Sequence, residues 1–213
     1  MRLPDVIPLF PLPNVVFFPR MPLPLHIFEP RYRAMVRDAA RGARLIGMVL
    51  LRGDWERDYH GTPPIFATGT VGEMVRSEEL PDGRSNIVLR GLREFEVVRE
   101  LPADPYRTAE VRWRDADAVP LPSGARDAIL APVGRYLERL GVGPAPPALV
   151  APSVDDESFV NFFAQQLDLA PIDKQALLEA RTLPERASRL VDALEFRLEE
   201  LRTQPAGAPT RAQ

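Results

Sequence analysis

Two neighbouring stretches decide the fold: Ile7–Pro13, which reads IPLFPLP, and Pro24–Arg33, which reads PLHIFEPRYR. Eight prolines lie within residues 4–30, yet apolar side chains separate them. A disordered proline-rich segment would be polar, because a chain with few apolar side chains has no core to offset the entropy of ordering. Proline holds φ at about −65° and has no backbone N–H, so it suits strand ends, edges and turns. These stretches therefore predict short strands with fixed corners at the start of a β-domain.

The period of the apolar residues changes after Pro30. Pro30 itself suits the first turn of a helix, where its missing donor would be unpaired anyway. Gly42 is typical of a left-handed helix cap. Between them, apolar side chains follow the i, i+3, i+4, i+7 spacing of one helix face: Tyr32, Met35, Val36 and Ala39. We therefore predict a helix that begins at Pro30 and ends at Gly42.

This succession of motifs closely resembles the amino-terminal substrate-binding domain of the ATP-dependent Lon proteases, a family also found as a stand-alone protein. The resemblance covers about residues 5–202. It implies an α+β fold, with an N-terminal PUA-like β-barrel followed by a C-terminal helical bundle. It also implies binding of unfolded or exposed polypeptide rather than catalysis. The motif residues are expected to have structural roles: Pro8, Phe10, Pro11, Phe28, Glu29, Pro30, Arg31 and Tyr32.

The middle of the chain predicts β-strands. Residues 44–51 (RLIGMVLL) form a near-continuous apolar run, as expected of a strand buried on both faces. The sequence LPDGR at 80–84 predicts a hairpin turn, because Asp-Gly accommodates positive φ. Gly69 and Gly72 indicate a bulge or a corner in their strand. Three further strands are expected at residues 65–75, 87–97 and 109–113.

The carboxy-terminal third predicts helices. Ser123 is a favourable N-cap for the first helix, in which Pro132 should introduce a kink. Residues 141–152 are rich in glycine and proline, so we expect a loop there. Later helices are expected from near Ser153, around residues 176–178 and from Thr182, where TLPE is a capping-box pattern. The predicted domains are a PUA-like β-barrel with one inserted helix at 1–118, a helical bundle at 119–203 and a disordered tail at 204–213.

Composition excludes several classes of site. The 213 residues carry a net charge of −3 and include no cysteine, which excludes disulfides, Fe–S clusters and thiolate zinc and fits a cytoplasmic location. No run of about 18 apolar residues occurs, so we expect no membrane partner. The single lysine, Lys174, precedes Gln175, so neither a GxxxxGK[ST] phosphate loop nor a Ser–Lys peptidase dyad is expected. We therefore expect no enzyme activity, no catalytic residue, no cofactor and no metal ion.

Polar residues of the motif leave alternatives open. Glu29, Arg31 and Arg33 form either a charged rim that holds a peptide or an internal ion pair and cap that fixes the helix. His26 and His60 are the only histidines, and histidine serves as a base, a metal ligand or a pH sensor. We interpret His26 as structural, within the motif, and His60 as an exposed loop residue. No HxxxH spacing supports a metal site.

Five residues are candidates for polypeptide contact: Phe17, Phe18, Met21, Trp55 and Tyr59. We expect most of Phe17, Phe18 and Met21 to belong to the core, as aromatic residues in a strand usually do. Phe17 and Phe18 are adjacent, however, so in a strand they point to opposite faces, and exposure of one of them is the alternative. An exposed aromatic side chain beside the flexible Met21 would suit a promiscuous apolar site. Trp55 and Tyr59 lie in a polar loop, and loops carry binding function disproportionately.

Two classes of function remain open. The leading one is a non-catalytic polypeptide-binding module in protein quality control or proteolysis. Its expected partners are unfolded or damaged polypeptides, with an ATP-dependent protease and a homodimer as further open possibilities. The alternative is an RNA-binding protein that uses the PUA-like barrel. Charge argues against nucleic acid, which generally needs a basic face: residues 1–115 hold 17 arginines and 16 acids, net +1, and residues 116–213 hold 10 basic and 14 acidic groups, net −4.

Overall fold

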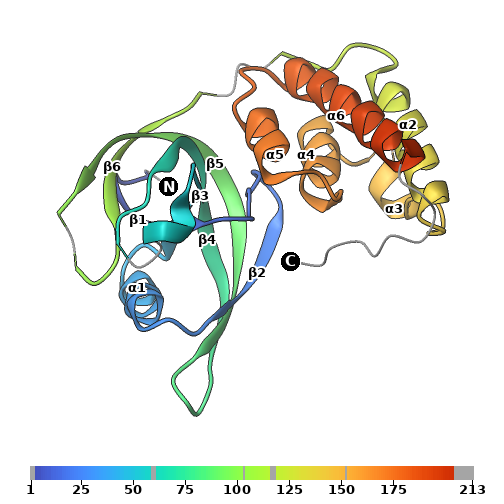
Figure 1. Cartoon of the computed structure of the whole chain (residues 1–213). Coiled ribbons are helices and arrows are strands. Elements are labelled where there is room, and N and C mark those ends of the chain that lie inside the picture. Colours follow the sequence, from blue (N-terminus) through green and yellow to red (C-terminus); the bar gives the residue numbers. More distant parts are fainter. Residues whose placement is uncertain (1–2, 59–60, 103, 116–118, 152, 204–213) are drawn as a thin grey trace. The chain divides into compact units, whose positions relative to one another are not determined.

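The computed structural model describes residues 3–58, 61–102, 104–115, 119–151 and 153–203 (Figure 1). The chain forms two compact units. The first, called the sheet unit, comprises the residues up to 116 together with Asn161–Leu167. The second, called the helical unit, comprises residues 117–160 and the chain from Asp168 onward. A mixed sheet combined with helices is the α+β class, as the sequence predicts.

Six strands make up one mixed sheet in the order β2-β5-β4-β3-β1-β6. Only β1 and β3 pair in parallel. Strand β5 also pairs with β6, so the pairings run from β5 through β4, β3, β1 and β6 and return to β5, while β2 extends the sheet beyond this ring. The strands are β1 Val6–Leu12, β2 Pro22–Ile27, β3 Leu45–Leu51, β4 Ile65–Glu79, β5 Ser85–Leu101 and β6 Thr108–Trp113.

Strand β1 accommodates its two prolines because it changes partner along its length. Its first half, up to Pro8, pairs with β6, and its second half, from Leu9, pairs with β3. Each proline therefore has a strand on one side only, which is the edge condition that a residue without an N–H requires. This arrangement explains how a strand inside the sheet carries the IPLFPL sequence.

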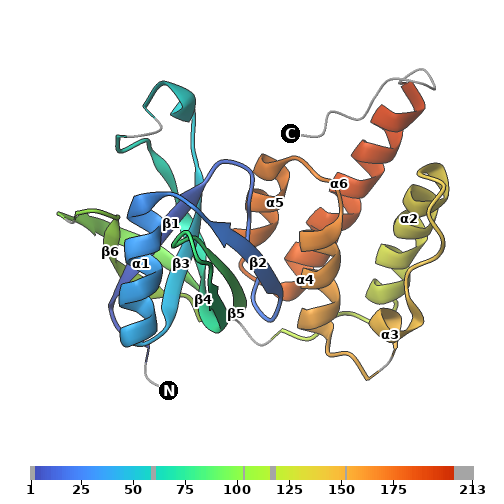
Figure 2. The same cartoon turned by 90° about the horizontal axis from the view of Figure 1, so that it is seen from below.

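The core of the sheet unit is a cluster of buried apolar residues from β1, β3, β4, β5 and β6, with Ile7, Leu9 and Phe95 among them. Helix α1, Pro30–Arg41, packs against β1. Figure 2 shows α1 alongside β1 and β3. Tyr32 of the helix packs on Phe10 of β1, with ring centroids 4.2 Å apart. The four apolar residues that predict the helix face are all buried, so the predicted helix is confirmed. Gly42 ends the helix with φ −108°, however, and not in the predicted left-handed conformation.

The predicted strands and the hairpin between β4 and β5 are confirmed. Gly83 has φ 78° in the turn, and its N–H donates to the carbonyl oxygen of Leu80 at 2.8 Å. The register of β4 against β5 shifts between Val71 and Gly72, so a glycine does mark an irregularity here. A second shift falls between Met74 and Arg76.

The helical unit contains the helices of the carboxy-terminal third. Helices α2 and α6 lie side by side in both views (Figures 1 and 2). The Thr182 hydroxyl accepts a hydrogen bond from the Glu185 N–H at 3.2 Å, so the predicted cap of the last helix is confirmed. The helices are α2 Ala125–Arg139, α3 Pro147–Val150, α4 Asp156–Gln166, α5 Pro171–Leu178 and α6 Leu183–Thr203, and the second half of α4 belongs to the sheet unit.

Three predictions for this third of the chain differ from the structure in detail. Helix α2 begins after Gly124 and has no side-chain cap, so Ser123 is not its N-cap. Helix α4 begins later than Ser153, because Asp155 provides the cap: its carboxylate accepts hydrogen bonds from the N–H and hydroxyl of Ser158. The predicted loop at 141–152 contains the short helix α3, whose proline-rich start suits a first helical turn.

Candidate functional site

Three of the predicted contact residues belong to the core. Phe17 and Phe18 are 1% and 0% exposed, and Met21 is also buried. The alternative in which one phenylalanine points outward is therefore wrong. The alternation of faces applies only within a strand, and both residues lie in the irregular segment between β1 and β2. The Phe17 carbonyl accepts a hydrogen bond from the Thr70 hydroxyl, and the Phe18 N–H donates to Gln165 Oε1 at 3.2 Å.

The predicted loop aromatics are only partly described. Trp55 begins a 3-10 helix, Trp55–Asp58, and its side chain is half-buried between exposed neighbours. Tyr59 and His60 lie outside the described residues. The structure therefore does not bring the five predicted contact residues together in one described surface.

The charged residues of the motif make internal contacts. Arg31 Nε lies 3.0 Å from Glu29 Oε2, and the Arg31 guanidinium lies 4.6 Å from the centre of the Tyr32 ring. Both contacts hold the first turn of α1. A Cβ atom added to Gly83 would collide with the Arg33 guanidinium, so Arg33 lies against the β4–β5 turn. These contacts favour an internal ion pair over a rim that holds a peptide, but the Glu29 side chain makes no capping hydrogen bond to the helix.

An exposed aromatic side chain lies where the sequence predicts a structural residue. Phe28 is 60% exposed, and its ring is stacked on that of His26 with centroids 6.3 Å apart. The alternation of side chains along β2 predicts that Phe28 is exposed. Ile27 is buried, whereas Pro22, Pro24 and His26 are exposed, so continued alternation places Phe28 on the outer side.

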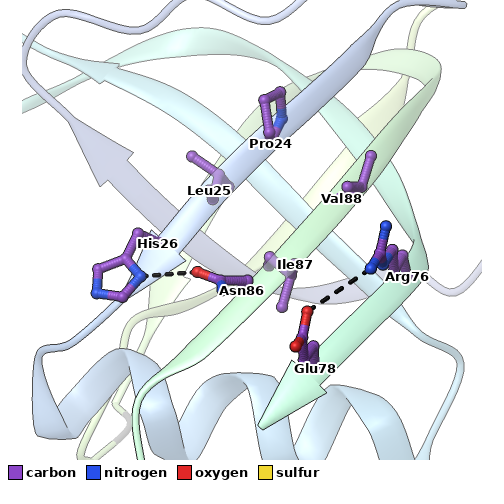
Figure 3. Close-up of a pocket in the computed structure, with 8 residues that line it drawn as sticks. All are labelled: Pro24, Leu25, His26, Arg76, Glu78, Asn86, Ile87 and Val88. Carbon is purple, nitrogen blue, oxygen red and sulfur yellow. Dashed lines mark hydrogen bonds and ion pairs between the residues drawn. The ribbon is translucent and has the colours of Figure 1, made fainter. Parts of the chain in front are cut away.

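Beside His26, the outer face of β2, β5 and β4 forms a shallow depression of about 450 Å³ (Figure 3). The strand register aligns its residues in rows across the three strands. Pro24 lies opposite Val88, which lies opposite Arg76, and His26 lies opposite Asn86, which lies opposite Glu78. One row thus brings Pro24 and Val88 next to Arg76, and the other consists of the polar residues His26, Asn86 and Glu78. We call this surface, together with Phe28, the outer face.

The charges of the outer face compensate one another. Arg76 and Glu78 form an ion pair at 3.6 Å. Beyond the depression, Arg90 pairs with Glu73 and Arg84 pairs with Asp82, each at 2.6 Å. The Arg84 backbone N–H and guanidinium lower the pKa of the Asp82 carboxyl, because both stabilise its charged form.

His26 belongs to the hydrogen-bond network at the edge of this face. Its Nδ1 lies 2.8 Å from Asn86 Oδ1, and its Nε2 lies 3.4 Å from Arg84 Nη1. A neutral ring with the proton on Nδ1 satisfies both contacts, since it donates to Asn86 and accepts from Arg84. His26 is therefore held in place by hydrogen bonds, as expected of a structural residue.

This arrangement suits contact rather than covalent chemistry. Pro24, Leu25 and Val88 supply apolar area, and the surrounding groups supply hydrogen-bond donors and acceptors. Among the described residues, no group of three or more histidine, aspartate or glutamate side chains is placed to hold a metal ion. No described helix is long and apolar enough to cross a membrane.

Comparisons with known proteins identify relatives over most of the chain. A family model described as the ATP-dependent protease La (LON) substrate-binding domain matches residues 6–195. Lon protease from Parabacteroides distasonis is 28% identical over 209 residues, which are 93% of this chain and 25% of that protein. Lon protease 2 from Myxococcus xanthus is 29% identical over 209 residues, 94% of this chain and 24% of that protein. The chain thus spans about a quarter of the length of these relatives.

Solved structures show the same fold. A Lon N-terminal domain protein from Xanthomonas campestris superposes with a TM-score of 0.65 at 26% identity, covering 88% of this chain and 97% of that one. The N-terminal domain of Mycobacterium avium complex Lon protease gives a TM-score of 0.66 at 14% identity, covering 89% and 98%. The second similarity concerns the fold alone.

Proposed function

Because this chain belongs to the family of the ATP-dependent protease La (LON) substrate-binding domain, we propose that it is a polypeptide-binding module of protein quality control. Its clients are unfolded or damaged polypeptides, which it presents to an ATP-dependent protease. The matched family region is a non-catalytic binding domain, and we propose that the chain acts in the cytoplasm without a cofactor. We further propose that the ring of strand pairings is a PUA-like barrel.

The observation that supports this proposal is that the outer face exposes apolar side chains while its charged groups pair with one another. An unfolded client has no fixed shape, so it is recognised through exposed apolar side chains. Phe28, Pro24 and Val88 offer apolar contact to such a client from one side of the sheet. RNA would require cationic side chains that face its phosphates, yet Arg76, Arg84 and Arg90 each have a carboxylate partner within the protein.

Fluorescence anisotropy separates the two classes of function. A labelled unfolded peptide and a labelled single-stranded RNA are each titrated with the protein at low and high salt. We expect peptide binding on the order of micromolar, about 8 kcal/mol, with little dependence on salt. RNA binding through several phosphates would instead fall steeply between about 50 and 200 mM salt. Tight, salt-sensitive RNA binding without peptide binding would overturn the proposal.

The loop aromatics remain proposed contact residues in addition to the outer face. Replacing Trp55 and Tyr59 together by alanine should weaken peptide binding in the same titration. Unchanged peptide binding by this double variant would show that neither aromatic side chain contributes to client contact.

A further inference from the structure

We propose that the client is an uncharged apolar segment that contacts the outer face through its side chains and does not add a strand to the sheet. This inference rests on the proposed function and specifies its mode of recognition. Exposed sheet edges commonly bind extended peptides through backbone hydrogen bonds. Whether a client can bind this sheet in that way depends on the backbone donors and acceptors that its edge strands expose.

The outer edge of β2 has few donors to offer. The Gly91 N–H donates to the Met21 carbonyl at 2.9 Å, and residues of the same parity along β2 bond to β5 in the same direction. Pro22, Pro24 and His26 therefore direct their backbone groups away from β5. Neither proline has an N–H, so His26 supplies the single backbone donor of β2 on this edge.

Side chains from the second half of α4 occupy the start of this edge. Gln165 Nε2 donates to the Pro22 carbonyl at 2.9 Å, and Asn161 Nδ2 donates to the Pro19 carbonyl at 3.1 Å. The Pro22 carbonyl, which a strand added to β2 would need, is thus already hydrogen-bonded, and Asn161 holds the chain just before β2. Both β2 prolines and both amide side chains thus hinder the pairing of this edge with another chain.

A second open stretch is the end of β4. The pairing of β4 with β3 stops at Glu73. At the next residue, the Met74 carbonyl accepts hydrogen bonds from Arg44 Nε at 2.9 Å and from Arg44 Nη2 at 2.7 Å. Beyond Met74, the exposed strand carries three charged side chains, Arg76, Glu78 and Glu79. Charged side chains on an edge strand discourage edge-to-edge pairing.

The charge pattern indicates which segments fit the face. Arg76, Arg84 and Arg90 each pair with a neighbouring carboxylate, so Pro24 and Val88 lie in a surface without excess charge. A segment with a net charge would gain no attraction from the face and would lose hydration over Pro24 and Val88. An uncharged apolar segment is complementary to it.

The test uses defined peptides and the full chain. The parent probe is a fluorescein-labelled decapeptide in which leucine alternates with serine. The second probe is N-methylated at its odd residues and the third at its even residues, so that each probe lacks the backbone N–H donors along one of its two edges. A fourth and a fifth probe replace two serines by aspartate or by lysine. Side-chain recognition predicts that both methylated peptides bind within about threefold of the parent, and that both charged peptides bind at least about fivefold more weakly.

Matched valine variants localise the contact. Val88→Ser should weaken binding of the parent peptide several-fold, whereas Val98→Ser, on the same strand and 57% exposed, should leave it unchanged. A loss of tenfold or more with either methylated peptide would show strand addition and overturn this inference while leaving the proposed function intact. Tighter binding of a charged peptide, or equal binding by both valine variants, would also overturn the inference. Binding of none of the five peptides would overturn the proposed function itself.

Discussion

Gly69 lies where β4 passes closest to the aromatic core of the sheet unit. A Cβ atom at this position would lie 2.7 Å from Cζ of Phe95 and would also collide with the carbonyl oxygen of Met48. The carbonyl belongs to the neighbouring strand and cannot rotate away. The requirement for glycine is therefore steric, since any side chain would separate β3 from β4.

We expect Gly69→Ala to lower the free energy of unfolding by about 3 kcal/mol, at the upper end of the usual cost of overpacking. Gly134 is the matched control, because it is exposed within α2 and a Cβ there meets nothing within 4 Å. Gly134→Ala should raise the free energy of unfolding by about 0.5–1 kcal/mol, through the better helix propensity of alanine. Urea unfolding measures both changes, and equal effects at the two glycines would contradict this account.

At the scale of elements, the second half of α4 holds the segment between β1 and β2. Gln165 accepts from the Phe18 N–H and donates to the Pro22 carbonyl, while the buried Asn161 donates to the Pro19 carbonyl. Phe18 and Pro19 lie in the irregular segment, and the Pro22 carbonyl faces away from β5, so none of these groups bonds to a neighbouring strand. The helix thus satisfies the polar groups of a segment whose side chains, Phe17 and Phe18, are in the core.

Gln165→Ala should accelerate amide hydrogen exchange at Phe18, because its N–H loses its acceptor. It should also lower the free energy of unfolding by about 1–3 kcal/mol, the usual cost of leaving a buried polar group without a partner. Gln166→Ala is the control, since Gln166 is exposed on the same helix. Exchange at Phe18 that is equally fast in both variants would argue that the hydrogen bond from the Phe18 N–H to Gln165 does not stabilise the fold.

Local patterns in the sequence predict those elements that local rules determine. The spacing from Tyr32 to Ala39 predicts α1, and Asp82-Gly83 predicts the hairpin, because both depend on neighbouring residues alone. The burial of Phe18 depends on Gln165, which lies 147 positions further along the chain, and no local pattern contains that contact. Phe28 differs in kind: the family motif predicts a structural residue, whereas the alternation along β2 places its side chain on the outer side, where it is exposed.

At the scale of the whole molecule, the predicted domain boundary at residue 118 can be tested with a fragment. The sequence predicts a β-domain at 1–118, whereas the compact sheet unit also includes Asn161–Leu167. A fragment of residues 1–118 therefore keeps every strand but loses the hydrogen bonds that Asn161 and Gln165 make to the segment at 18–22.

We expect the 1–118 fragment to be soluble and to give a mainly β circular dichroism spectrum. Its unfolding midpoint in urea should lie below that of the 1–203 fragment, because each lost hydrogen bond contributes about 1 kcal/mol. An unfolded 1–118 fragment would show that the helical segment is an indispensable part of one core.

The central claim is that the outer face captures unfolded polypeptide through exposed apolar side chains. The most direct test compares two phenylalanines of similar exposure, Phe28 at 60% and Phe196 of α6 at 66%. A labelled, reduced and carboxymethylated protein serves as the unfolded client, and its anisotropy is followed as each variant is added. Micromolar binding is expected for the unchanged chain and for Phe196→Ala, with at least about fivefold weaker binding for Phe28→Ala at unchanged stability. Equal affinity of Phe28→Ala and the unchanged chain would contradict the account.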